Sequence, residues 1–159
     1  MIRKIMSDLE WEAKFGKLGF HIENGKVIVS PEWEQSNIVS FLLPIFIEHK
    51  FQVNRNVVTD LVKIFTQIEQ QGLDKYIDIK DTELNGGCYC PRFSKANRTK
   101  LSRHSWGVPF DLNPTSNQYG TKGAMSPEII KIFNDNGWCW FGDLEHPDPM
   151  HFELAKIVG

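Results

Sequence analysis

Two short stretches of the sequence alternate apolar and polar residues, and this alternation restricts how each can fold. Residues 108–113 place their apolar side chains on one face of an extended chain and Asp111 on the other. Residues 150–154 repeat the pattern and set His151 apart from its apolar neighbours. We predict a β-strand at each stretch. Pro109 has no N–H to donate, so we expect either that the first strand lies at an edge of its sheet or that the backbone nitrogen of Pro109 faces away from the neighbouring strand.

Two other segments are typical of amphipathic helices. Apolar residues recur at helical spacing over 56–71, with Asn56 as the expected N-cap and Gly72 just beyond the end. A second helix is expected between the cap Ser126 and Gly137, with a proline in its first turn. Both helices have one apolar face that must be buried against another element.

The remaining elements are shorter. We predict strands at 26–29, 76–80 and 138–141, and a buried helix over 36–46 that is kinked at Pro44. Helices and strands do not alternate regularly along the chain. The predicted fold class is therefore α+β, a single domain whose antiparallel sheet carries the functional residues, with helices packed against it.

The length and composition limit the function classes. The 159 residues fit one domain, which we assign to 36–159, with residues 1–35 as an N-terminal extension packed on the core. A hydrophobic share of 41% excludes a disordered chain. With 18 Lys+Arg against 20 Asp+Glu, the net charge of −2 argues against a nucleic-acid binder. We expect a monomer.

Neither a membrane span nor an export signal is expected. No apolar run reaches the roughly 18 residues that a spanning helix needs. The first residues lack the apolar core of a signal peptide, so we expect synthesis in the cytoplasm, with reduced thiols.

The segment SRHSWGVPFDLN carries the first candidate ligands. His104 precedes Asp111 by seven positions, and a bend at 105–107 would let the two side chains converge. His151 is the third candidate. Two imidazoles and one carboxylate suit Zn²⁺ and leave one coordination position open. Asp148 lies three residues before His151, between two prolines, where its carboxylate could accept a proton from water.

The pattern S-x-H-x-x-G-x-x-x-D-L-N, a Trp-rich strand and then D-P-M-H-F-E resembles the zinc peptidases of bacterial cell-wall peptides. This family includes D-alanyl-D-alanine carboxypeptidases, VanX- and VanY-like enzymes and phage L-alanyl-D-glutamate endopeptidases. Its metal-site fold is shared by the hedgehog amino-terminal domain. The resemblance covers residues 53–153, roughly two-thirds of the chain.

The resemblance implies roles for six residues. Three positions match the zinc ligands of the family: His104, Asp111 and His151. Asp148 matches the general base, and Arg92, in GGCYCPRF, matches an arginine that contacts substrate and stabilises the developing oxyanion. Ser102 matches a serine at the substrate-binding edge. The sequence departs from the common family pattern at Pro109 and Cys90.

Plainer interpretations remain open. Asp148 is also typical of a turn residue, Arg92 could pair with Glu83, and Ser102 could cap a turn. The three cysteines offer a rival structural zinc site: Cys88, Cys90 and Cys139.

The resemblance implies a metallopeptidase that requires Zn²⁺ and hydrolyses peptidoglycan stem peptides. An aspartate as base favours an L-alanyl-D-glutamate endopeptidase, as in phage endolysins. The alternatives are a D-alanyl-D-alanine carboxypeptidase and a non-catalytic zinc-binding interaction domain. Without a signal peptide, we expect action at the cell wall or periplasm after release or delivery.

Overall fold

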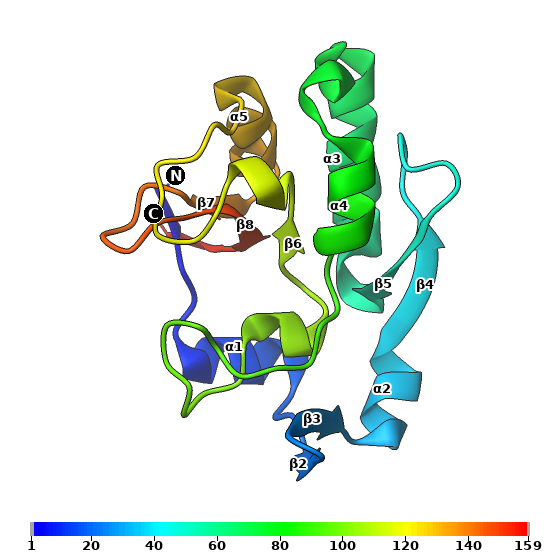
Figure 1. The fold of residues 1–159 in the computed structure, drawn as a ribbon, viewed down its shortest axis with the longest axis vertical. Coiled ribbons are helices and arrows are strands. Elements are labelled where there is room, and N and C mark those ends of the chain that lie inside the picture. Colours follow the sequence, from blue (N-terminus) through cyan, green and yellow to red (C-terminus); the bar gives the residue numbers. More distant parts are fainter. Residues whose placement is uncertain (1, 159) are drawn as a thin grey trace.

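The computed structural model describes residues 2–158, which form a mixture of helices and antiparallel strands (Figure 1). The helices are α1 (Asp8–Phe15), α2 (Pro31–Asn37), α3 (Val58–Gln70), α4 (Ile79–Asn85) and α5 (Pro127–Asp135). The strands are β1 (Ile2–Lys4), β2 (Phe20–Glu23), β3 (Lys26–Val29), β4 (Ile38–Leu42), β5 (Lys50–Asn54), β6 (Phe110–Asp111), β7 (Trp138–Phe141), β8 (Asp148–Leu154) and β9 (Lys156–Val158). The predicted α+β class is confirmed.

A three-stranded antiparallel sheet in the order β6-β8-β7 is the centre of the fold. Both strands inferred from alternation are in it, although the first is shorter than predicted and extends only over Phe110–Asp111. β6 lies at the edge, one of the two arrangements predicted from Pro109. The register sets Asp111 directly opposite His151.

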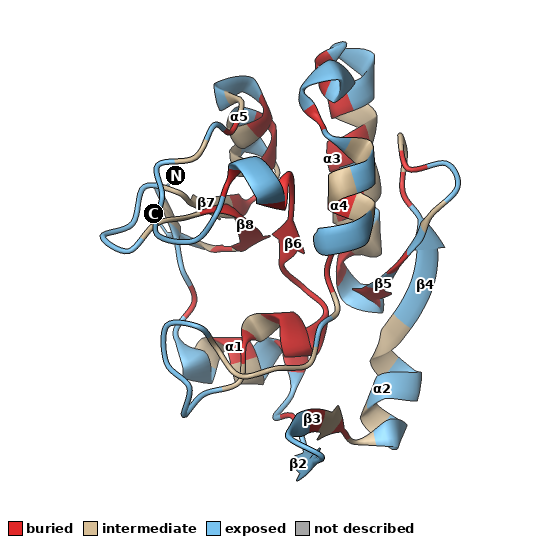
Figure 2. Cartoon of the chain, viewed as in Figure 1, coloured by how far each residue is buried: buried red, intermediate tan, exposed pale blue. Residues whose placement is uncertain are grey.

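Aromatic side chains anchor this sheet to the helices. Phe133 of α5 stacks on Phe152 with ring centroids 4.0 Å apart, and Phe65 of α3 lies 5.0 Å from Phe110. All four rings are fully buried, and Figure 2 shows the buried residues concentrated where α3 and α5 face the sheet. Because Phe110 and Phe152 adjoin Asp111 and His151 in sequence, the core fixes the direction of both polar side chains.

The two predicted amphipathic helices are confirmed as α3 and α5. Gly72 follows α3 in the left-handed conformation, at φ 67°, and Ser126 caps α5. The start of α3 differs from the prediction. Asn54 caps a short 3-10 helix (Arg55–Val57) by accepting a hydrogen bond from the backbone N–H of Asn56 at 3.0 Å.

The predicted helix over 36–46 is wrong. Its residues form the end of α2 and the strand β4, which pairs with β5, and then turns. Pro44 biases the preceding residue towards extended conformations and ends any helix there. The apolar run that remains is too short for its spacing to separate a helix from a strand.

The predicted strand over 76–80 is also wrong. A 3-10 helix (Leu73–Tyr76) ends there and α4 begins. Asp78 caps α4 by accepting a hydrogen bond from the backbone N–H of Asp81 at 3.1 Å. Capping outweighs an alternation that extends over only five residues. The predicted strands 26–29 and 138–141 are confirmed as β3 and β7.

The N-terminal residues share the core of the rest of the chain. Trp11, Phe15, Val27 and Val29 are buried in the same hydrophobic cluster as the sheet and α3. The expected boundary between residues 35 and 36 falls inside α2, and the division into extension and domain remains a prediction. Over residues 2–158, no helix is both long enough and apolar enough to cross a membrane.

Candidate metal centre

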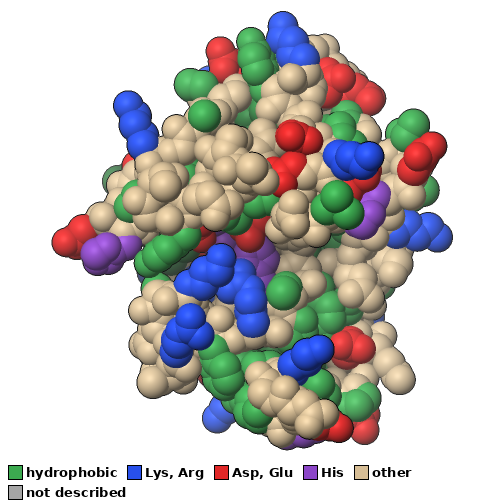
Figure 3. Space-filling model, in the orientation of Figure 1, with side chains coloured by type: hydrophobic (Ala, Val, Ile, Leu, Met, Phe, Trp, Pro, Cys, Tyr) green, Lys and Arg blue, Asp and Glu red, His purple; other side chains and the backbone are tan. Residues whose placement is uncertain are grey.

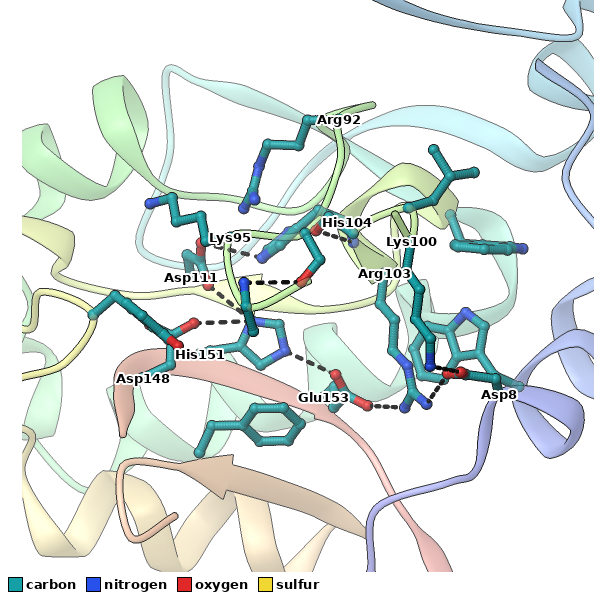
Figure 4. A pocket seen from close by; sticks show the side chains of 18 of the residues that line it. Asp8, Arg92, Lys95, Lys100, Arg103, His104, Asp111, Asp148, His151 and Glu153 are labelled. Atoms are coloured by element: carbon teal, nitrogen blue, oxygen red, sulfur yellow. Dashed lines mark hydrogen bonds and ion pairs between the residues drawn. The ribbon is translucent and has the colours of Figure 1, made fainter. Parts of the chain in front are cut away.

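The structure brings the three candidate ligands together (Figure 4). His104 lies on a 3-10 helix (Arg103–Trp106), Asp111 on β6 and His151 on β8. Their potential ligand atoms all lie within 4.8 Å of one another. Nε2 of His104 is 3.1 Å from Oδ2 of Asp111, and Nδ1 of His151 is 3.3 Å from Oδ1. We call these three residues the His–Asp–His cluster.

The bend expected before Asp111 is built on Gly107. This residue ends the 3-10 helix in the left-handed conformation, at φ 71°, which favours glycine. A Cβ there would also lie 3.1 Å from the backbone nitrogen of Asn54. The turn therefore directs His104 back towards the strand that carries Asp111.

Hydrogen bonds on their far sides orient both imidazole rings. Nδ1 of His104 donates to the backbone carbonyl of Cys88 at 2.7 Å, which leaves Nε2 facing the cluster. Nε2 of His151 contacts Oε1 of Glu153 at 2.8 Å, which leaves Nδ1 facing the cluster. Histidine ligands of metals are commonly held in this way.

The residues present fit a zinc ion. Nε2 of His104 and Oδ1 of Asp111 are buried, and neither has a hydrogen-bond partner within residues 2–158. Buried polar atoms without partners are costly, so their convergence indicates a missing positive charge. Two imidazole nitrogens and one carboxylate oxygen are a donor set that zinc accepts, with one position left open.

The electrostatics of the cluster depend on the histidines. Burial alone would raise the pKa of Asp111, but His104 and His151 hold it well below its usual range. Burial alone would lower the pKa of His151, but the adjacent carboxylates of Asp111 and Glu153 raise it to about 10. Without a metal, His151 is therefore protonated at neutral pH.

Zinc binding should release a proton from His151. Since the pKa of this ring is about 10 without metal, His151 holds a proton below that pH and must lose it to coordinate. Zinc affinity should rise with pH up to about 10. Calorimetry at pH 7 in buffers of different ionisation enthalpy should give about one proton released per zinc. Binding heats that are independent of the buffer would contradict this prediction.

Asp148, at the start of β8, lies beside the cluster. Its Oδ2 is 3.9 Å from Nδ1 of His151, and its Oδ1 is buried without a hydrogen-bond partner within the described residues. Burial raises the pKa of this carboxyl, and the charge of Asp111 adds to the effect. The sequence predicted an extended segment at Asp148, and the residue is the first of β8, next to the His–Asp–His cluster. Its role as a general base remains a prediction.

The cluster opens into a cavity of about 830 Å³ between the sheet and the N-terminal residues. Arg92 and Lys95 line it, and neither has an ion-pair partner within residues 2–158, so the alternative pairing of Arg92 with Glu83 is not found. Figure 3 shows histidine and acidic side chains in a hollow, with Lys and Arg side chains along one rim.

Ser102 also lines the cavity, but its hydroxyl has a structural task. It caps the 3-10 helix by accepting a hydrogen bond from the backbone N–H of His104 at 3.2 Å. The turn-capping interpretation therefore describes its observed contact, and a contact with substrate remains a prediction.

The rival cysteine site is not formed within the described residues. There, the three ligands of the His–Asp–His cluster are the one group close enough to share an ion. Cys88 is buried, Cys90 is exposed and Cys139 is intermediate. Cys88 contributes to the metal centre through its backbone carbonyl, which accepts a hydrogen bond from His104, and not through its thiol.

Sequence reasoning missed two residues behind the cluster, Glu153 and Arg103. Glu153 is fully buried between His151 and the guanidinium of Arg103. Its position two residues after His151 on the same strand was the available signal, because such residues share a face.

Comparison with known protein families finds a match in the part of the chain that contains this site. Residues 95–154 match the model of a family described as D-alanyl-D-alanine carboxypeptidase. The resemblance to this family is thereby confirmed over the segment that contains the His–Asp–His cluster and Asp148. No curated protein and no solved structure matches the chain significantly.

Proposed function

We propose that this protein is a zinc-dependent peptidoglycan peptidase that cleaves the L-alanyl-D-glutamate bond of the stem peptide. The observation that carries the proposal is a partly buried carboxylate, Asp148, beside a His–Asp–His cluster at the base of a large cavity. When bound, zinc supplies a Lewis acid that acidifies water and polarises the scissile carbonyl.

Asp148 is the general base in this proposal. It accepts a proton from the attacking water and passes it to the leaving amine. Burial raises its pKa, which makes the carboxylate a better proton acceptor than an exposed aspartate. Its Oδ1 has no hydrogen-bond partner within the described residues that would compete for the water.

Arg92 and Lys95 suit a substrate that carries negative charge. Arg92 is proposed to stabilise the charge that develops on the carbonyl oxygen, an effect worth roughly 3–4 kcal/mol for a well-placed donor in other enzymes. Stem peptides carry free carboxylates, which would provide Lys95 with a partner. Ser102, on the same wall, is proposed to contact the peptide.

Digestion of purified murein by the zinc-loaded protein tests the proposal. Mass spectrometry should show stem peptides released by cleavage after L-Ala. Release of D-Ala alone would instead support a D-alanyl-D-alanine carboxypeptidase, the activity in the description of the matched family. Zinc binding with no peptide release would support a non-catalytic interaction domain.

The site of action is part of the proposal. We propose a monomer that is made in the cytoplasm and reaches the cell wall or periplasm by release or delivery, as an endolysin does. Addition of the protein to intact and to permeabilised cells should cause lysis where the wall is accessible. Lysis that is equally fast in both would contradict the need for release.

A further inference from the structure

A chain of charged side chains continues from His151 away from the His–Asp–His cluster (Figure 4). Glu153 contacts Nε2 of His151 through Oε1 at 2.8 Å and accepts a hydrogen bond from Nη1 of Arg103 on Oε2 at 2.6 Å. Its side chain is only 1% exposed. A buried carboxylate of this kind is stable only when its charge is paired, so Arg103 and His151 together hold it.

The N-terminal residues hold Arg103, at the other end of this row of interacting side chains. Nη2 of Arg103 donates to the backbone carbonyl of Met6 at 2.6 Å and to Oδ1 of Asp8 at 3.2 Å. Its guanidinium carbon also lies 4.6 Å from the ring centroid of Trp11. These contacts, made on several sides of a rigid planar group, restrict the position of the guanidinium.

We propose that Arg103 and Glu153 are positioning residues through which the N-terminal segment 6–11 fixes the ring of His151 at the metal centre. The inference rests on the proposed zinc site. It gives a function to residues 6–11, which lie outside the segment matched by the family model, residues 95–154.

The physical argument concerns the freedom of the imidazole. Glu153 holds one ring nitrogen of His151, so the other points at the cluster. Without Arg103, the buried carboxylate of Glu153 keeps only one charged partner, His151, and is no longer held in place from its other side. The imidazole of His151 then loses the fixed acceptor that sets its orientation. Loss of such orienting contacts typically weakens metal binding 10–100-fold.

The test measures zinc affinity by competition with a chelator, and the absorption spectrum of the Co²⁺-loaded protein. Arg103→Gln should bind zinc about 10–100-fold more weakly and show an altered Co²⁺ spectrum. Arg103→Lys, which keeps the charge but not the planar fork, should recover part of the affinity. Asp8→Asn should lower zinc affinity less than Arg103→Gln, because the Met6 carbonyl still holds the guanidinium.

Lys156→Gln is the matched control. Lys156 forms an ion pair of 2.6 Å with Glu10, so it also links the N-terminal residues to the C-terminal strand. Within residues 2–158 it makes no hydrogen bond or ion pair with Arg103 or Glu153. This variant should keep the parental zinc affinity and Co²⁺ spectrum. Circular dichroism shows whether each variant is folded. If Arg103→Gln fails to fold, Glu153→Gln provides the same measurement, because Glu153 lies between Arg103 and His151.

Parental affinity and spectrum in folded Arg103→Gln, or in Glu153→Gln where that replaces it, would overturn the inference. So would an equal loss in Lys156→Gln, which would indicate general loosening of the N-terminal segment. Parental affinity in Asp8→Asn would overturn the part of the inference that assigns a contribution to Asp8. Failure of the parent protein to bind zinc would overturn the metal centre itself. Zinc binding without peptidase activity would contradict the proposed function alone.

Discussion

Replacing Asp148 with asparagine should lower kcat for stem-peptide cleavage about 10²–10⁴-fold, the usual contribution of a general base. Asparagine keeps the shape of the side chain but cannot accept the proton of the attacking water. Zinc should remain bound, because Asp148 lies beside the three ligands and is not one of them. Peptide release under zinc-replete conditions and metal analysis of the same preparation would measure both quantities.

Asp143→Asn is the control for this experiment. Asp143 is an exposed aspartate in the connection between β7 and β8, five residues before Asp148, and it is not among the residues that line the cavity. Its replacement should leave activity and zinc content at parental levels. Full activity in Asp148→Asn would contradict the base role, and loss of zinc from that variant would place Asp148 among the ligands.

The positions of Asp111 and His151 could be predicted because strand alternation is a local property. Each is flanked by apolar residues that the core buries, so the face of each polar side chain follows from its neighbours. The pairing of β6 with β8 joins residues 40 positions apart, as Asp111 and His151 are, and local patterns do not encode such a distance. Only the resemblance to the family motif predicted that Asp111 and His151 lie close together.

Glu153 and Arg103 show the opposite case. A carboxylate two residues after a histidine looks like an ordinary exposed strand residue, yet Glu153 is fully buried. Its burial is tolerable because Arg103, 50 positions earlier in the chain, neutralises it. Arg103 in turn depends on Met6 and Asp8, in a region whose sequence has no strong periodicity. The network is built from three distant segments, and the two-residue spacing of His151 and Glu153 is the one part of it that a single segment records.

The two wrong elements have a similar cause. Residues 36–46 and 76–80 are short, and each contains apolar residues whose spacing fits more than one structure. One residue accounts for each outcome. Pro44 disfavours a helix in the first segment, and the cap at Asp78 favours a helix in the second. The long helix α3 was predictable because its apolar face repeats over several turns.

Replacing His151 with alanine should abolish both tight zinc binding and peptidase activity. The variant loses one of the three ligand atoms of the His–Asp–His cluster. This loss should lower zinc affinity more than the roughly 10–100-fold typical of a residue that only orients a ligand. It also removes a charged partner from Asp111 and from Glu153, both buried, so the metal-free form should be less stable as well.

Metal analysis after dialysis and thermal unfolding with and without zinc would measure these effects. The Tm of the parent should rise with zinc because the ion binds the folded state, and the Tm of His151→Ala should not respond. The control is His21→Ala, at an exposed histidine of the β2–β3 hairpin that should leave the zinc response intact. One tightly held zinc per chain in His151→Ala would show that the ion binds elsewhere, and the roles proposed for Asp148 and Arg103 would then lose their common centre.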